Sequence, residues 1–176
     1  NTSIVYSSIG DKGAAELGKN TTWTKLETLD ITSNSLGCEG IKQLSKNTVG
    51  EPIELILYSN TIGDEGATEL SKNASWIDLR TVDLGANSIG DEGAAALGQN
   101  KSWINLQALG LEGNNIAAKE VIGLSSEHEL ADLQMLNLAD NKIGSEGAAA
   151  LSRNTTWNNL QTLNLYNCSL NDQGAV

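Results

Sequence analysis

The amino-acid sequence repeats itself at intervals of about 27 residues along its whole length. The string Ile-Gly-Asp-x-Gly-Ala begins at Ile9, Ile62 and Ile89, and a close relative of it begins at Ile143. A unit of this size cannot enclose a core of its own, so adjacent copies must stack and each copy contacts only its neighbours. The repeat therefore predicts a solenoid.

Every copy combines the signal of a short strand with that of a helix. In Leu26-x-x-Leu29-x-Ile31-x-x-Asn34-x-Leu36, residues 28–32 alternate between outward and inward positions, which indicates a strand. Further along, apolar residues spaced three apart mark one face of a helix, expected at residues 91–99 in one copy. The chain is predicted to contain seven units, numbered 1 to 7 below, of which the outer two are incomplete. Their approximate bounds are residues 1–25, 26–51, 52–78, 79–105, 106–132, 133–159 and 160–176.

This pattern resembles the leucine-rich repeat, whose signature is L-x-x-L-x-L-x-x-N/C-x-L. The second half of a unit, Gly-Asp-Glu-Gly-Ala-x-x-Leu at residues 63–70, resembles the ribonuclease-inhibitor-like subclass. The resemblance implies a single α/β domain over residues 1–176, a horseshoe-shaped solenoid with a parallel sheet on its concave side and α-helices on its convex side. Neither end of the sequence shows the polar cap that terminal units normally carry, so we also expect a longer repeat array.

One polar position in each unit is predicted to be structural. A buried asparagine can satisfy backbone groups in the turn after the strand, because its amide both donates and accepts hydrogen bonds. Cysteine, which the signature allows at this position, is a weak donor. A polar ladder that binds a ligand is the alternative interpretation. The positions are Asn34, Asn60, Asn87, Asn114, Asn141 and Cys168.

Three further repeated features are also explained as structural. Tryptophans that precede the first consensus leucine are expected in the core, each with a partner for its indole N–H. Acidic residues at the helix starts are expected to favour the helix dipole. Asparagines that follow the helices are expected to take the left-handed conformation past a helix end, and several also read as glycosylation sequons. The three sets are Trp23, Trp76, Trp103 and Trp157; Asp11, Asp64, Glu65, Asp91, Glu92 and Glu146; and Asn20, Asn47, Asn73, Asn100 and Asn154.

Composition excludes several classes of function. The net charge of −11 argues against nucleic-acid binding, and no run of about 18 apolar residues indicates a membrane span. Cys38 and Cys168 lie five units apart, too far for a disulfide, and no signal peptide is visible. Free thiols favour a cytoplasmic location. The single histidine, His128, cannot form a metal centre alone, and neither a cofactor site nor a catalytic constellation is predicted.

The outward positions of the predicted strands are the candidate binding surface. They carry neither Lys nor Arg, and they include acidic residues and exposed apolar ones. An aromatic side chain ringed by polar groups is typical of an interface hot spot, although scattered exposed apolar residues are also ordinary. The predicted partner-binding residues are Asp30, Thr32, Glu54, Ile56, Tyr58, Asp83, Glu112, Asn164 and Tyr166.

These observations favour a non-enzymatic protein-interaction module that presents a neutral-to-acidic concave face to a basic protein partner. One alternative is a GTPase-activating-protein-like regulator, because the Ran GTPase-activating proteins are built from similar repeats. Another is a secreted bacterial effector or surface recognition module, which the regular, Asn-rich repeats suggest. No motif in the sequence singles out either alternative.

Overall fold

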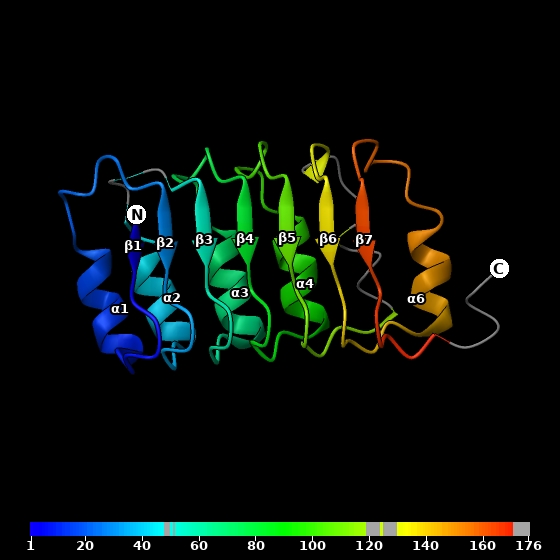
Figure 1. Ribbon diagram of the computed structural model, residues 1–176, viewed down its shortest axis with the longest axis horizontal. Coiled ribbons are helices and arrows are strands. Elements are labelled where there is room, and N and C mark those ends of the chain that lie inside the picture. Colours follow the sequence, from blue (N-terminus) through cyan, green and yellow to red (C-terminus); the bar gives the residue numbers. More distant parts are fainter. Residues whose placement is uncertain (48–49, 51, 119–123, 125–129, 171–176) are drawn as a thin grey trace.

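The computed structural model describes residues 1–47, 50, 52–118, 124 and 130–170. Strands and helices alternate from residue 2 to residue 110 and again from residue 135 to residue 164 (Figure 1). The strands are β1 (Thr2–Ser3), β2 (Thr28–Asp30), β3 (Glu54–Ile56), β4 (Thr81–Asp83), β5 (Ala108–Gly110), β6 (Met135–Asn137) and β7 (Thr162–Asn164). The helices are α1 (Gly10–Gly18), α2 (Cys38–Leu44), α3 (Gly63–Ser71), α4 (Asp91–Gly98) and α6 (Gly144–Leu151).

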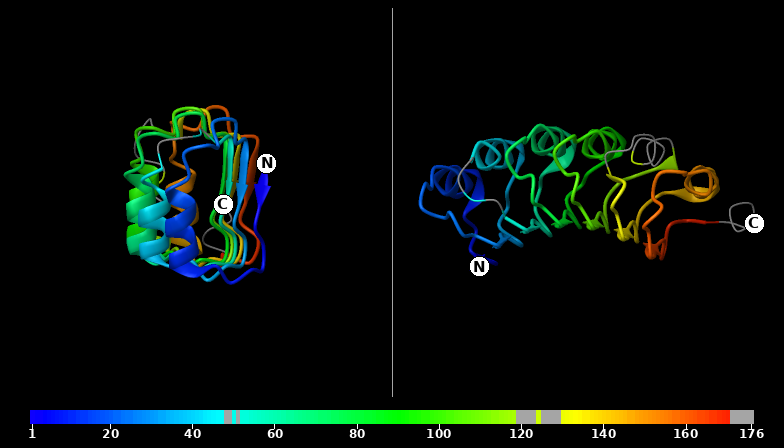
Figure 2. Two further views of the ribbon diagram at one scale, coloured as in Figure 1. Left: turned by 90° about the vertical axis from the view of Figure 1, so that its left-hand side faces the viewer. Right: turned by 90° about the horizontal axis from the view of Figure 1, so that it is seen from above.

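The strands form one parallel sheet in sequence order, from β1 to β7. Seen end-on, the molecule has two layers, with the sheet on one side and the helices on the other (Figure 2). Seen from above, the helices follow a shallow arc on the outer side of the sheet (Figure 2). The prediction of an α/β solenoid with a parallel sheet and helices on opposite sides is therefore confirmed.

The register of the sheet aligns equivalent residues of successive units. Leu29 pairs with Leu55, and Leu55 pairs with Val82, so the inward side chains stack in a column. Each complete strand is only three residues long, shorter than the predicted residues 28–32. At the end of β2, Asp30 Oδ1 accepts the N–H of Thr32 at 3.0 Å, and this bond turns the chain there.

A single apolar core runs between the two layers. It consists mainly of the inward Leu and Ile side chains, with small residues such as Ala67 and Ala94 on the helices. Trp76, Trp103 and Trp157 are buried in it, as predicted, whereas Trp23 is only partly buried against it. The expected partner for the indole N–H is absent, however, since Nε1 of Trp103 and of Trp157 contacts no acceptor in the described part of the chain.

The prediction for the asparagines after the helices is wrong in its conformation. The φ angle is negative at all five of these residues, so none takes the left-handed form: Asn20, Asn47, Asn73, Asn100 and Asn154. They act through their side chains instead: Asn100 Oδ1 accepts the N–H groups of Ser102 (2.7 Å) and Trp103 (2.9 Å). Its Nδ2 donates to the carbonyl oxygen of Ser71 in the preceding unit at 2.7 Å. These residues form a second ladder of side-chain hydrogen bonds between units.

Some sequence predictions fall outside the described residues. They concern His128 and the helix that the repeat predicts in unit 5. Both described cysteines are free, as predicted, with Cys38 partly exposed and Cys168 buried. Within the described residues, no helix is long and apolar enough to cross a membrane.

Candidate partner-binding face

The asparagine positions that follow the strands link neighbouring units by side-chain hydrogen bonds. Asn114 Oδ1 accepts the N–H groups of Asn87 (3.0 Å) and Ile89 (2.9 Å). Its Nδ2 donates to the carbonyl oxygens of Leu84 and Leu111, both at 3.0 Å. The equivalent asparagines of units 2, 3, 4 and 6 make bonds of the same kind. In unit 7, Cys168 Sγ donates to the carbonyl oxygen of Leu138 at 3.0 Å. This column lies inside the solenoid and is buried, so it supports the sheet and is not part of its surface.

The outward residues at the strand ends have a double role. Asp30, Asp83, Asn137 and Asn164 each accept, at Oδ1, the N–H of the residue two positions later, at distances of 2.9–3.1 Å. This bond turns the chain out of the strand, while each side chain stays at least partly exposed on the outward face of the sheet. The carboxylates of Asp30 and Asp83 are therefore held in place by the fold and are not free to rotate away.

Two other predicted acidic residues are also positioned by neighbours on the sheet. Glu54 Oε2 accepts the hydroxyl of Thr28 at 3.0 Å, and Glu112 Oε2 accepts the amide Nδ2 of Asn137 at 2.8 Å. Both bonds come from uncharged donors, so they orient the carboxylates and leave the negative charge in place. The sheet register sets Ile56 between Asp30 and Asp83.

Two glycines leave room on this face where other units carry side chains. A Cβ added at Gly85 would lie 2.7 Å from both Cδ2 and Cε2 of Tyr58, so the tyrosine ring lies against Gly85. A Cβ added at Gly110 would lie 2.8 Å from Asp83 Oδ1, so the carboxylate leans over Gly110. Tyr58 keeps 38% of its surface exposed. An aromatic ring and a carboxylate thus lie on adjacent glycine positions of the sheet.

The electrostatic environment of Asp83 is negative. Burial raises the pKa of its carboxyl above the ordinary value, and the negative charges of Glu112 and Asp30 raise it further, while the hydrogen bond from Gly85 acts in the opposite direction. A cation placed here would offset the repulsion among the three carboxylates. The outward strand positions carry no such cation, since no Lys or Arg occurs among them.

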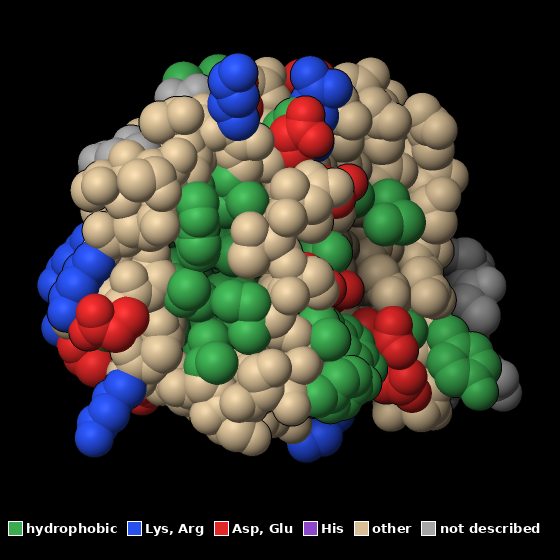
Figure 3. Space-filling model, turned by 60° about the vertical axis from the view of Figure 1, so that its left-hand side comes forward, with side chains coloured by type: hydrophobic (Ala, Val, Ile, Leu, Met, Phe, Trp, Pro, Cys, Tyr) green, Lys and Arg blue, Asp and Glu red, His purple; other side chains and the backbone are tan. Residues whose placement is uncertain are grey.

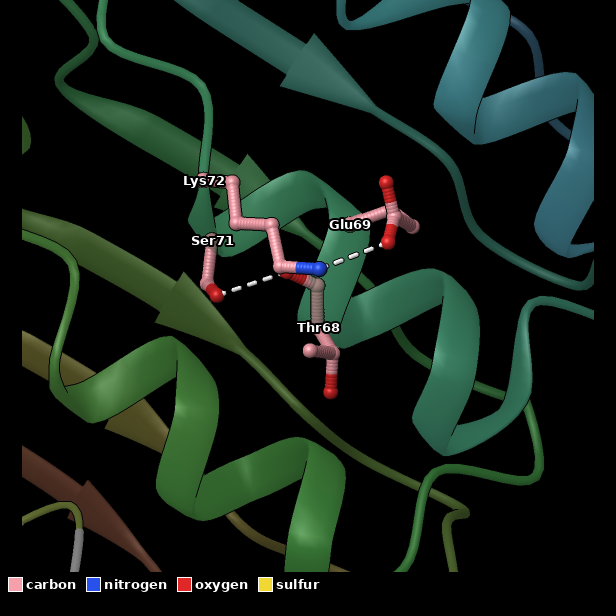
Figure 4. Close-up of polar contacts among 4 residues, drawn as sticks. All are labelled: Thr68, Glu69, Ser71 and Lys72. Atoms are coloured by element: carbon pink, nitrogen blue, oxygen red, sulfur yellow. Dashed lines mark hydrogen bonds and ion pairs between the residues drawn. The ribbon is translucent and has the colours of Figure 1, made fainter.

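The basic residues lie elsewhere. Figure 3 shows acidic and hydrophobic side chains on the sheet side of the molecule, with Lys and Arg towards the helix side and the rims. At the end of α3, Lys72 Nζ binds Glu69 Oε1 at 2.7 Å, next to a bond from Ser71 Oγ to the carbonyl oxygen of Thr68 (Figure 4). The bond from Lys72 lowers the pKa of Glu69. Lys19 and Glu16 form the same pair at the end of α1.

Comparison with known families agrees with the repeat and the fold. A family model described as Leucine Rich repeat matches residues 24–49, 53–71, 77–98 and 131–152, and a second, described as Leucine Rich Repeat, matches residues 159–175. The chain belongs to the leucine-rich repeat family. No curated protein matches it. Leucine-rich repeats generally mediate protein–protein interaction, and they typically act as binding modules and not as enzymes.

The leucine-rich repeat fold gathers most of the predicted binding residues into one patch. Seven of these residues lie on four neighbouring strands, β2 to β5, or two positions after the end of one: Asp30, Thr32, Glu54, Ile56, Tyr58, Asp83 and Glu112. We call these seven residues the acidic patch. Asn164 ends β7 and Tyr166 follows it, two strands beyond β5, so they do not join the acidic patch. Tyr166 is 73% exposed and is the better placed of the two for a contact of its own.

Sequence reasoning missed several features of this face. Gly85 and Gly110 were recognisable as outward positions without side chains, but their effect on Tyr58 and Asp83 depends on side-chain directions that only the structure shows. Tyr6 is exposed after β1, and Ile77 and Ile104 are exposed in the loops that lead into β4 and β5. Within the described residues, no group of three or more His, Cys, Asp or Glu could hold a metal ion.

Proposed function

We propose that this leucine-rich repeat domain binds a basic segment of a partner protein on the acidic patch of its concave face. The observation that carries the proposal is the combination at units 3 to 5: the Tyr58 ring over Gly85, the Asp83 carboxylate over Gly110, and Glu112 close enough to raise the pKa of Asp83. A Lys or Arg side chain laid over this part of the face would contact the carboxylates and the aromatic ring together.

Two features favour a protein segment as the ligand. The patch extends over four parallel strands that rise about 4.8 Å apart, so it offers a surface about 15 Å long, which suits an extended chain or a helix face. Its centre is an aromatic residue surrounded by polar groups, the arrangement of an interface hot spot. We also propose that residues 1–176 form one such domain within a longer repeat array.

The experiment compares binding by the wild-type domain with binding by single variants, using a fluorescent arginine-containing peptide and a glutamate-containing peptide of the same length. We expect the arginine peptide alone to bind, with an affinity that falls between 50 mM and 0.5 M salt, because exposed charges are screened. Tyr58→Ala and Asp83→Asn should each weaken it several-fold. Glu92→Gln, which removes one exposed charge on α4, is the matched control for Asp83→Asn and should have little effect.

Binding that ignores salt, or that is lost with Glu92→Gln and kept with Asp83→Asn, would contradict the proposal. The GTPase-activating and secreted-effector alternatives remain predictions, because no described residue supplies a feature specific to either. Acceleration of GTP hydrolysis by a small GTPase on adding the domain would favour the first alternative over simple binding.

A further inference from the structure

The peptide bond that opens each helix takes one of two orientations. In units 1, 3 and 6, the N–H of the helix-start glycine donates forward, to a carbonyl oxygen of the next unit. The donor and acceptor residues are Gly10 and Asn34, Gly63 and Asn87, and Gly144 and Cys168, at 2.9–3.0 Å. We call this the forward orientation. It places all three glycines in the left-handed region, with φ between +56° and +63°.

In units 2, 4 and 5, the same peptide is reversed. At Gly90 the N–H donates backward to Asp64 Oδ1 at 2.6 Å, and the carbonyl oxygen of Ile89 accepts the N–H of Asn115 at 2.7 Å. The φ of Gly90 is −102°. We call this the backward orientation. Its other two examples are Gly37, bound to Asp11 Oδ1 at 2.7 Å, and Ala117, bound to Asp91 Oδ1 at 2.6 Å.

The orientation follows one residue of the preceding unit, the one directly after its helix-start glycine or alanine. Where that residue is an aspartate, the next unit is backward. Units 3 and 6 are forward, and the residues that precede them at this position are Cys38 and Ala118. A buried N–H must have an acceptor, and a carboxylate makes a short, charge-assisted bond. Without the carboxylate, the N–H turns to the nearest carbonyl oxygen on the other side.

Residue types agree with these two orientations. The forward orientation requires positive φ, and every forward unit has glycine there; the unit with alanine at this position, Ala117, is backward. The backbone of the next unit also differs between the two orientations, at the residue that directly follows its buried asparagine or cysteine. It is a serine with φ of +57° after each forward unit, at Ser35, Ser88 and Ser169. After the backward unit 2 it is the β-branched Thr61, whose φ is negative.

We propose that the helix-start aspartates act as a conformational relay: each carboxylate selects the peptide orientation at the start of the next unit, and with it the backbone that joins that unit to the one beyond. The side chain of one unit thus determines how two other units are joined. The relay operates from Asp11, Asp64 and Asp91, and it is interrupted at Cys38 and Ala118.

The test is a double-mutant cycle at the interrupted position in unit 2. Gly63→Ala alone should lower the folded-to-unfolded equilibrium constant about tenfold, because alanine is strained at φ of +63°. No close side-chain contact adds to this strain, since Glu65 Oε2 lies 3.6 Å from an added Cβ. In a Cys38→Asp background, the introduced carboxylate should reverse the peptide, and Gly63→Ala should then change the constant less than about twofold.

Gly144→Ala is the matched control, because nothing lies within 4 Å of its added Cβ and Cys38→Asp does not precede its unit. Gly144→Ala should lower the folded-to-unfolded equilibrium constant about tenfold both in the wild type and in the Cys38→Asp variant. Urea unfolding supplies the constants, and a crystal structure of the Cys38→Asp variant should show Gly63 with negative φ. An unchanged cost of Gly63→Ala in the Cys38→Asp background, or Gly63 still at positive φ, would overturn the relay.

A second cycle guards against a Cys38→Asp variant that does not fold. Ala118→Asp restores the carboxylate before unit 6, so Gly144→Ala should become nearly neutral in that background while Gly63→Ala keeps its tenfold cost. Equal costs for the two glycine variants in the Ala118→Asp background would count against the relay. Removing a carboxylate tests the opposite direction. In the Asp91→Ala variant, residue 117 must adopt positive φ, so Ala117→Gly should stabilise the protein in that background. Destabilisation by Ala117→Gly in that background would contradict the proposal.

Discussion

The ring of Tyr58 lies against the backbone of Gly85, at a distance that no side chain at residue 85 would allow: an added Cβ would approach two ring carbons to 2.7 Å. Gly85 follows β4, whereas Tyr58 follows β3, so the ring leans across the sheet towards the next unit. The missing side chain of one unit therefore sets the position of the most central aromatic residue of its neighbour.

Gly85→Ala should weaken binding of the arginine peptide about as much as Tyr58→Ala does, because the methyl group displaces the ring. Fluorescence anisotropy measures the affinity, and urea unfolding checks that the fold is retained. In a Tyr58→Ala background, Gly85→Ala should have no further effect on the affinity. A loss that adds fully to that of Tyr58→Ala would show that Gly85 does not act through the tyrosine.

Asp83→Asn should stabilise the folded domain at neutral pH. The raised pKa means that folded Asp83 keeps its proton to a higher pH than unfolded Asp83, whose pKa is near 3.8. Between the two values the folded state binds more protons, so the free energy of unfolding falls as the pH rises through this window. Asparagine keeps the turn, as Asn137 shows by accepting the N–H of Ala139 at 3.1 Å.

Urea unfolding between pH 3 and 7 measures this effect, and Glu92→Gln is the control for a general loss of negative charge. We expect the difference between Asp83→Asn and the wild type to grow with pH and then level off. A variant that is less stable than the wild type at pH 7 would mean that Asp83 supports the fold by more than its turn. The same substitution should weaken peptide binding, so the carboxylate costs stability and serves recognition.

Asn114→Ala should destabilise the domain by about 3 kcal/mol or more, because it leaves the buried N–H groups of Asn87 and Ile89 without an acceptor and removes one of the two amide donors from the carbonyl oxygens of Leu84 and Leu111. Cys168→Ala, at the equivalent position of unit 7, removes a single weak donor and should cost about 1 kcal/mol. Thermal or urea unfolding gives both values. Equal losses for the two variants would show that the amide adds little beyond what the cysteine provides.

Asn100 should remain unmodified when the domain is produced in a glycosylating host, although it begins the sequon Asn100-Lys-Ser. Its side chain is buried, and Nδ2 donates to Ser71 O, so a glycan on this nitrogen is incompatible with the second ladder. Asn167, which begins another sequon, is exposed and is the internal comparison. Mass spectrometry of peptides from folded protein measures occupancy. A glycan on Asn100 in folded material would contradict the buried geometry.

Periodicity was sufficient to predict the fold because the repeat places the same residue types at the same positions in every unit. The inward Leu and Ile positions, the asparagine after each strand and the outward columns all follow from that spacing. The prediction of a left-handed conformation for Asn20 and its equivalents was wrong. Asparagine suits the left-handed conformation intrinsically, but its side-chain hydrogen bonds within the unit and to the neighbouring unit favour a negative φ at these positions.

The helix-start aspartates also have one role that the sequence predicts and a second role that only the structure shows. From the sequence, Asp11, Asp64 and Asp91 are helix-start charges that favour the dipole; in the structure, each also binds the N–H that opens the next helix. That bond depends on the distance between consecutive helix starts, which is a property of the stacked solenoid. No pattern within a single unit contains it.

The sequence by itself determined the solenoid, its parallel sheet and the identity of its outward residues, because these depend on spacing alone and recur in each unit. The tertiary structure decided which of those residues act together. Contacts between units place Tyr58 on Gly85, lean Asp83 over Gly110 and turn the helix-start peptide of one unit towards the carboxylate of another. Such contacts join residues about 27 positions apart, and their outcome depends on side-chain direction and local dielectric, which a linear pattern does not specify.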